Sequence, residues 1–305
     1  MKINLQDTTT ATWVILSLIV FTAMGYTWIA IRNQPPQMAF TTASGYQFPY
    51  HIAAGSGTKM ELGSTLKEIS GITSLNETQV MAIQDEKGIL YTVDLQTGNI
   101  VDEIPFDKDR DYEDLCLVGD HVFVVERDGD IYQVDMTSQD ATIKYETLFS
   151  YRNDVETLGF DPRHNRLLIA PKEGAPDSME IGEHTVGIYA FDLVNKRIKR
   201  QLVGSISERE IGTIIGKNGK PHSFKPSAIA VHPDSGNIYI LASVGKILIV
   251  LQPDGNRIMH VQLLDSLQFP QPEGIAFDPL GNLLISSEGT NTHPASITKF
   301  APTSM

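Results

Sequence analysis

The chain has 305 residues, an apolar content close to average and a formal charge of −13. A chain of this length forms one large domain or two small ones, and it can bury a stable core without disulfide bonds or structural metal ions. The negative charge argues against binding to nucleic acid or to an anionic membrane surface. The single cysteine, Cys116 in the apolar run LCLV, excludes an internal disulfide.

The N-terminal part contains a candidate membrane segment. Residues 11–31 read ATWVILSLIVFTAMGYTWIAI, without a charged side chain and with Trp13 and Trp28 near the two ends. At about 1.5 Å per residue, a helix of this length covers the roughly 30 Å hydrocarbon core of a bilayer. We therefore expect one N-terminal transmembrane helix after a short tail, residues 1–10. A secretory signal is the alternative, because Ala23-Met24-Gly25 is a small-x-small cleavage pattern.

The surroundings of this segment predict the topology. A short tail before the helix and a large domain after it favour a single-pass protein of the cell (inner) membrane, with the domain on the periplasmic or extracellular side. Residues 32–45, RNQPPQMAFTTASG, are polar with two adjacent prolines, and we expect them to be a linker.

From residue 46 onward the pattern is strand-like nearly everywhere, and it repeats. Short β-branched and aromatic runs alternate with Gly, Asp, Asn and Pro. Five of these runs are similar to one another: EISGITSL (68–75), YEDLCLVG (112–119), VETLGFDP (155–162), PSAIAVHP (226–233) and PEGIAFDP (272–279). Each is followed by a second and a third strand-like run. A period near 43 residues with four short strands per unit is typical of a β-propeller.

The spacing of the repeats predicts the number of blades. If Ser70, Glu113, Glu156, Ser227 and Glu273 are equivalent, the steps between them are 43, 43, 71 and 46 residues. We interpret the long step as one blade with insertions at 173–185 and 207–223, which gives an all-β, five-bladed propeller over residues 46–305. A sixth blade within the second insertion is the alternative. Because the last repeat shows only three strands, a strand from residues 46–62 is expected to complete it and close the ring.

Acidic residues are expected to gather at one mouth of the channel. In a blade, the start of the first strand and the end of the antiparallel second strand lie at the same end. Four blades place acids there, and the fourth blade has two serines instead. The pairs are Ser70 with Asp85, Glu113 with Glu126, Glu156 with Glu173, Ser227 with Ser243, and Glu273 with Glu288. Arg127 and Lys172 stand next to two of these acids.

The repeats resemble a known family. The motifs ISGIT, DRDYEDL with VVERDG, VETLGFDP with APKEG, and PEGIAFDPLGNLLISSE resemble those of the SdiA-regulated family of bacterial proteins over about residues 64–303. The resemblance implies an N-terminal membrane or export segment, a five-bladed propeller distantly similar to NHL-repeat propellers, and a bound calcium ion. The fourth blade departs from the pattern, since it reads ILASVGKI where the family has acidic or His-bearing versions.

The converging acids predict a cation site. Carboxylates close to one axis repel one another, and hard oxygen ligands from separate strands suit Ca²⁺. We expect Glu113, Glu156 and Glu273 to be ligands, with Glu126, Glu288 and Asp85 as further candidates. The alternative is that these acids cap strands or form ion pairs with Lys172 and Arg127.

Three functions are compatible with such a site. The first is a membrane-tethered calcium-binding module for an unknown protein or small-molecule ligand. The second is a metal-dependent hydrolase of a phosphoester, lactone or ester, in which Glu126, Glu173 or Glu288 acts as base and Lys172 and Arg127 hold an anionic substrate. Two basic residues are few for a phosphate site, which favours binding over catalysis. The third is a scaffold that meets an envelope protein through its sides.

Overall fold

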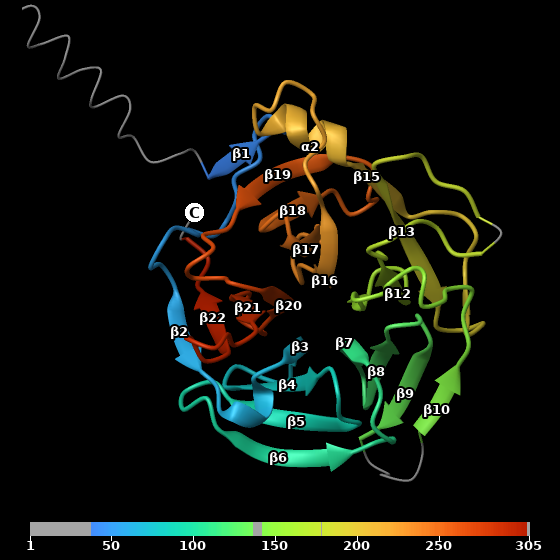
Figure 1. Ribbon diagram of the computed structural model, residues 1–305, viewed down its shortest axis with the longest axis vertical. Helices are drawn as coiled ribbons and strands as arrows, with labels where there is room; N and C mark the ends of the chain where they lie inside the picture. Colours follow the sequence, from blue (N-terminus) through green and yellow to red (C-terminus); the bar gives the residue numbers. More distant parts are fainter. Residues whose placement is uncertain (1–37, 137–141, 178, 304–305) are drawn as a thin grey trace, which may run out of the picture. The chain divides into compact units, whose positions relative to one another are not determined.

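The computed structural model describes residues 38–136, 142–177 and 179–303. Within these residues five antiparallel sheets are arranged in a ring around a central axis (Figure 1). The innermost strands of neighbouring sheets contact one another around the axis. The predicted five-bladed, all-β propeller is therefore confirmed.

Each blade has four or five strands, which are named here in order from the axis outwards. Blade 1 consists of β3 (Ile69–Ser74), β4 (Gln79–Gln84), β5 (Ile89–Asp94) and β6 (Ile100–Pro105). Blade 2 consists of β7 (Tyr112–Val118), β8 (His121–Glu126), β9 (Ile131–Asp135) and β10 (Thr142–Tyr145). Blade 3 consists of β11 (Gly159–Asp161), β12 (Arg166–Ile169) and β13 (Thr185–Asp192), which pairs with both β14 (Arg197–Ile198) and β15 (Gly204–Ser207).

The last two blades each incorporate a strand from the N-terminal side of the domain. Blade 4 consists of β16 (Lys225–Val231), β17 (Ile238–Val244), β18 (Ile247–Leu251), β19 (Ile258–Leu263) and β1 (Ala39–Thr41). Blade 5 consists of β20 (Pro272–Phe277), β21 (Leu283–Ser287), β22 (Ser296–Phe300) and β2 (Thr58–Glu61).

Strand β2 closes the ring, as the sequence predicted. It pairs antiparallel with β22 from Thr58 opposite Lys299 to Glu61 opposite Ser296, and in Figure 1 the blue strand lies against the red blade. This pairing satisfies the edge of β22, which would otherwise be exposed. Strand β1 lies within the range expected to be linker, but it pairs with β19 and extends blade 4.

The blades are held together by five apolar clusters, one at each junction between neighbours. In β4, Val80 and Ala82 face blade 5 while Met81 and Ile83 face blade 2, and all four are fully buried. Both faces of the sheet are covered, so this strand reads as a continuous apolar run rather than an alternating one. Burial of each large aliphatic side chain contributes roughly 1.5–3 kcal/mol.

The long third step of the repeat is one blade with insertions, as expected. The second insertion contains α2 (Glu208–Ile214), a short helix that the strand-like pattern did not predict, and a 3-10 turn, η1 (Ser64–Leu66), precedes blade 1. Ser207 caps α2, because its side chain accepts a hydrogen bond from the Glu210 amide.

The predicted membrane segment, residues 11–31, lies outside the described residues. Between residues 38 and 303, where the structure describes the chain, no helix is long and apolar enough to cross a membrane.

A buried histidine holds the N-terminal segment against blade 4. His260 of β19 lies within 3.0 Å of the Thr41 hydroxyl through Nδ1, and its ring stacks on Phe48 with centroids 4.1 Å apart. Its Nε2 has no hydrogen-bond partner among the described residues. Burial lowers the pKa of His260 to about 4.

This histidine predicts a loss of stability in acid. A pKa below the unfolded value of about 6.5 means that its contribution is complete above pH 6.5 and falls as the pH drops toward 4. His260→Phe keeps the stacking but cannot ionise. When the pH is lowered from 7.5 to 4.5, the wild type should therefore lose roughly 2 kcal/mol more unfolding free energy than this variant does. Urea denaturation of both proteins at the two pH values measures this gain, and an unchanged difference would contradict the assignment.

Candidate cation site at one mouth of the channel

The first residues of the innermost strands are turned into the channel by β-bulges. In β3, β7 and β16 an extra residue interrupts the pairing with the second strand, and these residues are Ser70, Glu113 and Ser227. In β20 the irregularity spans Glu273 and Gly274. A bulge leaves its extra residue outside the ladder and re-aims its side chain. The same local device therefore directs four of the five blades toward the axis.

Blade 3 reaches the same arrangement differently. Glu156 lies just before β11, where no regular pairing has begun. The hydroxyl of Thr157 replaces the backbone ladder, since it donates to the Ala170 carbonyl at 3.1 Å and accepts from the Ala170 amide at 2.6 Å. Glu156 is thereby fixed at the height of the bulged residues.

These residues surround a cavity of about 260 Å³, which we call the acidic cavity. It is lined by six carboxylate and two cationic side chains together with two serines and a glutamine. The lining residues are Ser70, Asp85, Glu113, Arg127, Asp154, Glu156, Lys172, Ser227, Gln271, Glu273 and Glu288. Acids from blades 1, 2, 3 and 5 thus meet at one mouth of the channel.

Most of the predicted site residues line this cavity. The structure brings together Glu113, Glu156, Glu273, Glu288, Asp85, Lys172 and Arg127. It places Glu126 and Glu173 elsewhere.

Glu126 is buried within blade 2, where it forms ion pairs with Arg110 and Lys144, both at 3.1 Å, and accepts a hydrogen bond from Tyr132 at 2.6 Å. Its backbone marks the end of β8, as the spacing argument required, but its side chain turns into the blade. Glu173 is about half exposed and pairs with Lys225 at 2.5 Å. Neither residue lines the acidic cavity.

Two lining residues, Asp154 and Gln271, were not predicted. Each stands two positions before the glutamate of its blade, Glu156 and Glu273 respectively. The corresponding position is polar in every repeat, which is the signal in the sequence that identifies them. The residues are Glu68, Asp111, Asp154, Lys225 and Gln271.

Burial and mutual repulsion raise the pKa values of the acids. The pKa of Glu113 is raised to about 9 by burial and then by Glu156, and that of Glu273 to about 8 for the same two reasons. Burial and Asp85 raise the pKa of Glu288 to about 7. Burial and neighbouring Glu68 raise the pKa of Asp85 to about 6. The cavity therefore has more carboxyl groups than its own two cations keep ionised at neutral pH.

Both cations of the cavity are already engaged. Lys172 Nζ forms a close ion pair with Glu156, and both side chains are largely buried. Arg127 Nε lies 2.6 Å from Asp154 Oδ1. Glu113, Glu273, Glu288 and Asp85 have no comparable ion pair among the described residues, and Asp85 Oδ1 is buried without a hydrogen-bond partner there.

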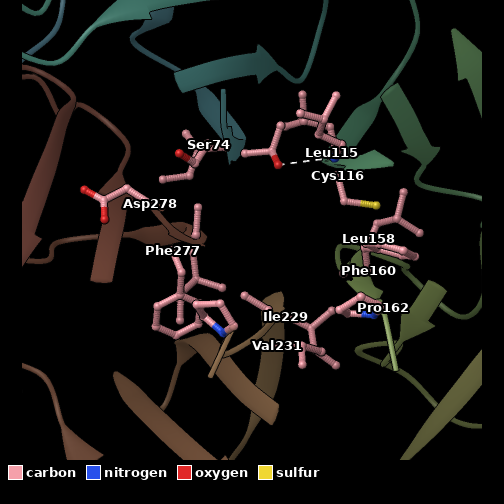
Figure 2. A pocket seen from close by; sticks show the side chains of 18 of the residues that line it. Ser74, Leu115, Cys116, Leu158, Phe160, Pro162, Ile229, Val231, Phe277 and Asp278 are labelled. Atoms are coloured by element: carbon pink, nitrogen blue, oxygen red, sulfur yellow. Dashed lines mark hydrogen bonds between the residues drawn. The ribbon is translucent and has the colours of Figure 1, made fainter. Parts of the chain in front are cut away.

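The opposite end of the innermost strands forms a different cavity of about 300 Å³, the apolar cavity. Figure 2 shows side chains from all five blades around it, among them Leu115, Cys116, Leu158, Ile229 and Phe277. The carboxylate of Asp278 at its rim is satisfied by Lys299 at 2.7 Å and by Asn282. The two mouths of the channel therefore differ sharply in polarity.

The donor set of the acidic cavity fits a hard cation. It offers carboxylate, hydroxyl and amide oxygens, no described histidine or cysteine lines it, and Asp85 presents an unpartnered oxygen. In the described parts of the chain, no three His, Cys, Asp or Glu side chains lie close enough together to hold an ion directly. Binding therefore requires rotation of the glutamates toward the axis or water ligands, both of which are common at Ca²⁺ sites.

Comparison with known proteins agrees with the architecture. No curated protein matches the sequence. Among solved structures, Myxococcus xanthus glutaminyl cyclase is similar with 13% identity and a TM-score of 0.54, covering 82% of this chain and 94% of its own. A Bacteroides thetaiotaomicron protein of unknown function shows 14% identity and a TM-score of 0.47, and the match covers 75% of this chain but only 55% of that protein. At 13% identity the likeness to the glutaminyl cyclase shows the fold alone.

The sequence itself carries a more specific match. The model of the SdiA-regulated family matches residues 54–292, which include most of the five blades and the whole lining of the acidic cavity. The chain belongs to the SdiA-regulated family.

Proposed function

We propose that this protein is a calcium-binding propeller whose acidic cavity holds Ca²⁺ and presents the occupied channel mouth to a partner protein or small ligand. The observation that carries the proposal is the surplus of buried carboxylates: six acids face two cations, and both cations are paired. Without a cation, these carboxyl groups stay partly protonated because they repel one another. A bound divalent cation allows them to ionise. Glu113, Glu273 and Glu288 are the residues that would hold it, with Asp85 and Glu156 beside them.

The state of the two cations favours binding over hydrolysis. A hydrolase acting on an anionic substrate needs free positive charge beside its metal. Here Lys172 is paired with Glu156 and Arg127 with Asp154, so neither faces the cavity as a free cation. Glu126 and Glu173, two of the three candidate bases, lie outside the cavity.

The proposal includes the predicted location. Residues 11–31 would anchor the propeller in the cell membrane, with the blades on the periplasmic or extracellular side, where Ca²⁺ is available. The uncharged 21-residue run supports this assignment. Fractionation of cells that express the full chain tests it, because recovery in the soluble fraction would contradict anchoring.

Calcium should stabilise the purified protein. For the full chain in detergent, Ca²⁺ at about 100 times its dissociation constant adds about 2.7 kcal/mol, a rise in melting temperature of roughly 5 to 10 °C over the EDTA-treated protein. Differential scanning fluorimetry measures this. Mg²⁺ at the same concentration should give a smaller rise, because it tolerates irregular oxygen sites poorly. Equal melting temperatures with EDTA and with Ca²⁺ would refute the proposal.

The Glu173→Gln variant is a matched control for this measurement. It removes the carboxylate that follows Lys172 in the sequence, which is exposed and lies outside the cavity. Its response to Ca²⁺ should equal that of the wild type.

A further inference from the structure

The innermost strands of a propeller have one edge that no strand covers. Their backbone N–H groups on that edge point toward the axis, and buried N–H groups need acceptors. In this chain a single carboxylate serves several of them. Asp114, the second residue after the start of β7, is only 2% exposed.

Asp114 accepts hydrogen bonds from two blades and lies near an amide of a third. Its Oδ1 accepts from the Leu115 amide of its own strand at 2.8 Å, and its Oδ2 accepts from the Leu158 amide of blade 3 at 2.7 Å. The Ile229 amide of blade 4 also lies near this carboxyl group and favours its ionised form. One side chain thus joins the axial edges of blades 2 and 3 and lies beside that of blade 4.

The three amides occupy equivalent positions in their blades. Leu115, Leu158 and Ile229 each stand two residues after the residue that lines the acidic cavity, namely Glu113, Glu156 and Ser227. A carboxyl group that contacts these amides therefore holds the backbone of each strand two residues away from its cavity residue.

Two hydroxyl groups make corresponding hydrogen bonds at two other junctions, between blades 1 and 2 and between blades 4 and 5. Ser70 Oγ donates to the Tyr112 carbonyl at 2.9 Å, and Ser227 Oγ donates to the Pro272 carbonyl at 2.8 Å. Tyr112 and Pro272 immediately precede Glu113 and Glu273. These two bonds each join one pair of blades through a hydroxyl group, whereas Asp114 joins blades 2 and 3 through a buried carboxyl group and also lies near blade 4.

We propose that Asp114 is a positioning residue for the acidic cavity: its carboxylate sets the spacing between the blades that carry Glu113, Glu156 and Ser227, and so determines cation affinity and size selectivity. It does not itself line the cavity or act as a ligand. The inference rests on the proposed calcium function. A buried backbone N–H that loses its acceptor destabilises the folded state, so loss of the Asp114 oxygens loosens the junction.

The test is Asp114→Asn in the full chain, with Ca²⁺ and Mg²⁺ dissociation constants from isothermal titration calorimetry. The amide keeps the size of the side chain but turns one acceptor into a donor that faces an N–H group. We expect the Ca²⁺ dissociation constant to rise at least about tenfold and the preference for Ca²⁺ over Mg²⁺ to fall, because size selectivity depends on the rigidity of the site.

Gly71→Ala is a second variant that leaves the carboxylate in place. A Cβ at Gly71 would lie 2.7 Å from Asp114 Oδ1 and 2.8 Å from its Cα, so Asp114 must move. It should weaken Ca²⁺ binding in the same direction, and it decides the question if Asp114→Asn does not fold. Cys116→Ala is the matched control, since Cys116 is buried in the same strand but lines the apolar cavity. It should lower the melting temperature without changing Ca²⁺ affinity.

The outcomes separate the two claims. Wild-type affinity and selectivity in Asp114→Asn and Gly71→Ala would overturn the positioning role while the calcium function stands. Absence of Ca²⁺ binding by the wild type would overturn the function itself, and the positioning role with it.

Discussion

In the absence of divalent cations, the protein is expected to lose stability as the pH rises from about 5 to 9. Glu113, Glu273 and Glu288 have folded-state pKa values of about 9, 8 and 7, above the usual 4.5. Between pH 4.5 and the folded-state pKa of each glutamate, the folded state binds more protons than the unfolded state. The unfolding free energy therefore falls as the pH rises. Because a pKa difference of one between the two states corresponds to about 1.4 kcal/mol, the three raised pKa values together amount to a loss on the order of 10 kcal/mol over the whole window.

Calcium should cancel this slope. Because Ca²⁺ binds the ionised acids, its stabilising effect should grow with pH and be small at pH 5. Urea denaturation at pH 5, 7 and 9, with EDTA and with Ca²⁺, measures both trends. Stability that rises with pH in EDTA would show that the acids are ionised without cost in the folded protein.

The Glu273→Gln variant assigns the effect to the acidic cavity. Glutamine cannot ionise, so at pH 9 in EDTA it should be more stable than the wild type by about 2 kcal/mol, and it should gain less from Ca²⁺. Glu126→Gln is the contrasting control. Glu126 is buried but paired with Arg110 and Lys144, which stabilise its charged form. Its loss should destabilise the protein with or without Ca²⁺ and leave the calcium response unchanged.

Substitution of Lys172 by methionine should have the second largest effect. Removal of one partner from a largely buried ion pair typically costs about 3–5 kcal/mol, and here Glu156 would be left among the five other acids of the cavity, which repel it. We therefore expect a loss of about 3 kcal/mol at pH 8 in EDTA. Since Glu156 is then free to face a cation, Ca²⁺ should bind about tenfold more tightly than to the wild type and restore much of the stability.

Lys225→Met is the matched control for this variant. Lys225 pairs with the exposed Glu173 on the neighbouring loop, and exposed pairs contribute at most about 1 kcal/mol. Thermal denaturation of both variants measures the loss of stability, and calorimetric titration measures the change in Ca²⁺ affinity. Weaker Ca²⁺ binding by Lys172→Met would mean that Lys172 supports the ion site rather than competing with the ion.

The architecture could be predicted because it depends on local patterns that repeat. The five runs that contain Ser70, Glu113, Glu156, Ser227 and Glu273 became the five innermost strands, and the chain segment before blade 1 supplied β2. The short helix α2 and strand β1 were not predicted. Each is too short for its periodicity to be distinguished from a loop, and β1 is a strand only because the edge of β19 is available to pair with it.

The spacing of the acids along the chain determined that they meet at one mouth, because antiparallel pairing returns each second strand to the starting end of the first. It could not determine where each side chain points. Glu126 and Glu288 stand near the ends of the second strands of their blades, but not at equivalent positions. Glu126 lies opposite Tyr112 as Ser287 lies opposite Pro272, so the equivalent of Glu288 is Arg127, which does line the cavity, whereas Glu126 points to Arg110 and Lys144 inside blade 2. This register depends on strand pairing, and the pairing of Lys172 with Glu156 and the blades joined by Asp114 depend on groups from separate strands. Only the tertiary structure brings such groups within hydrogen-bonding distance.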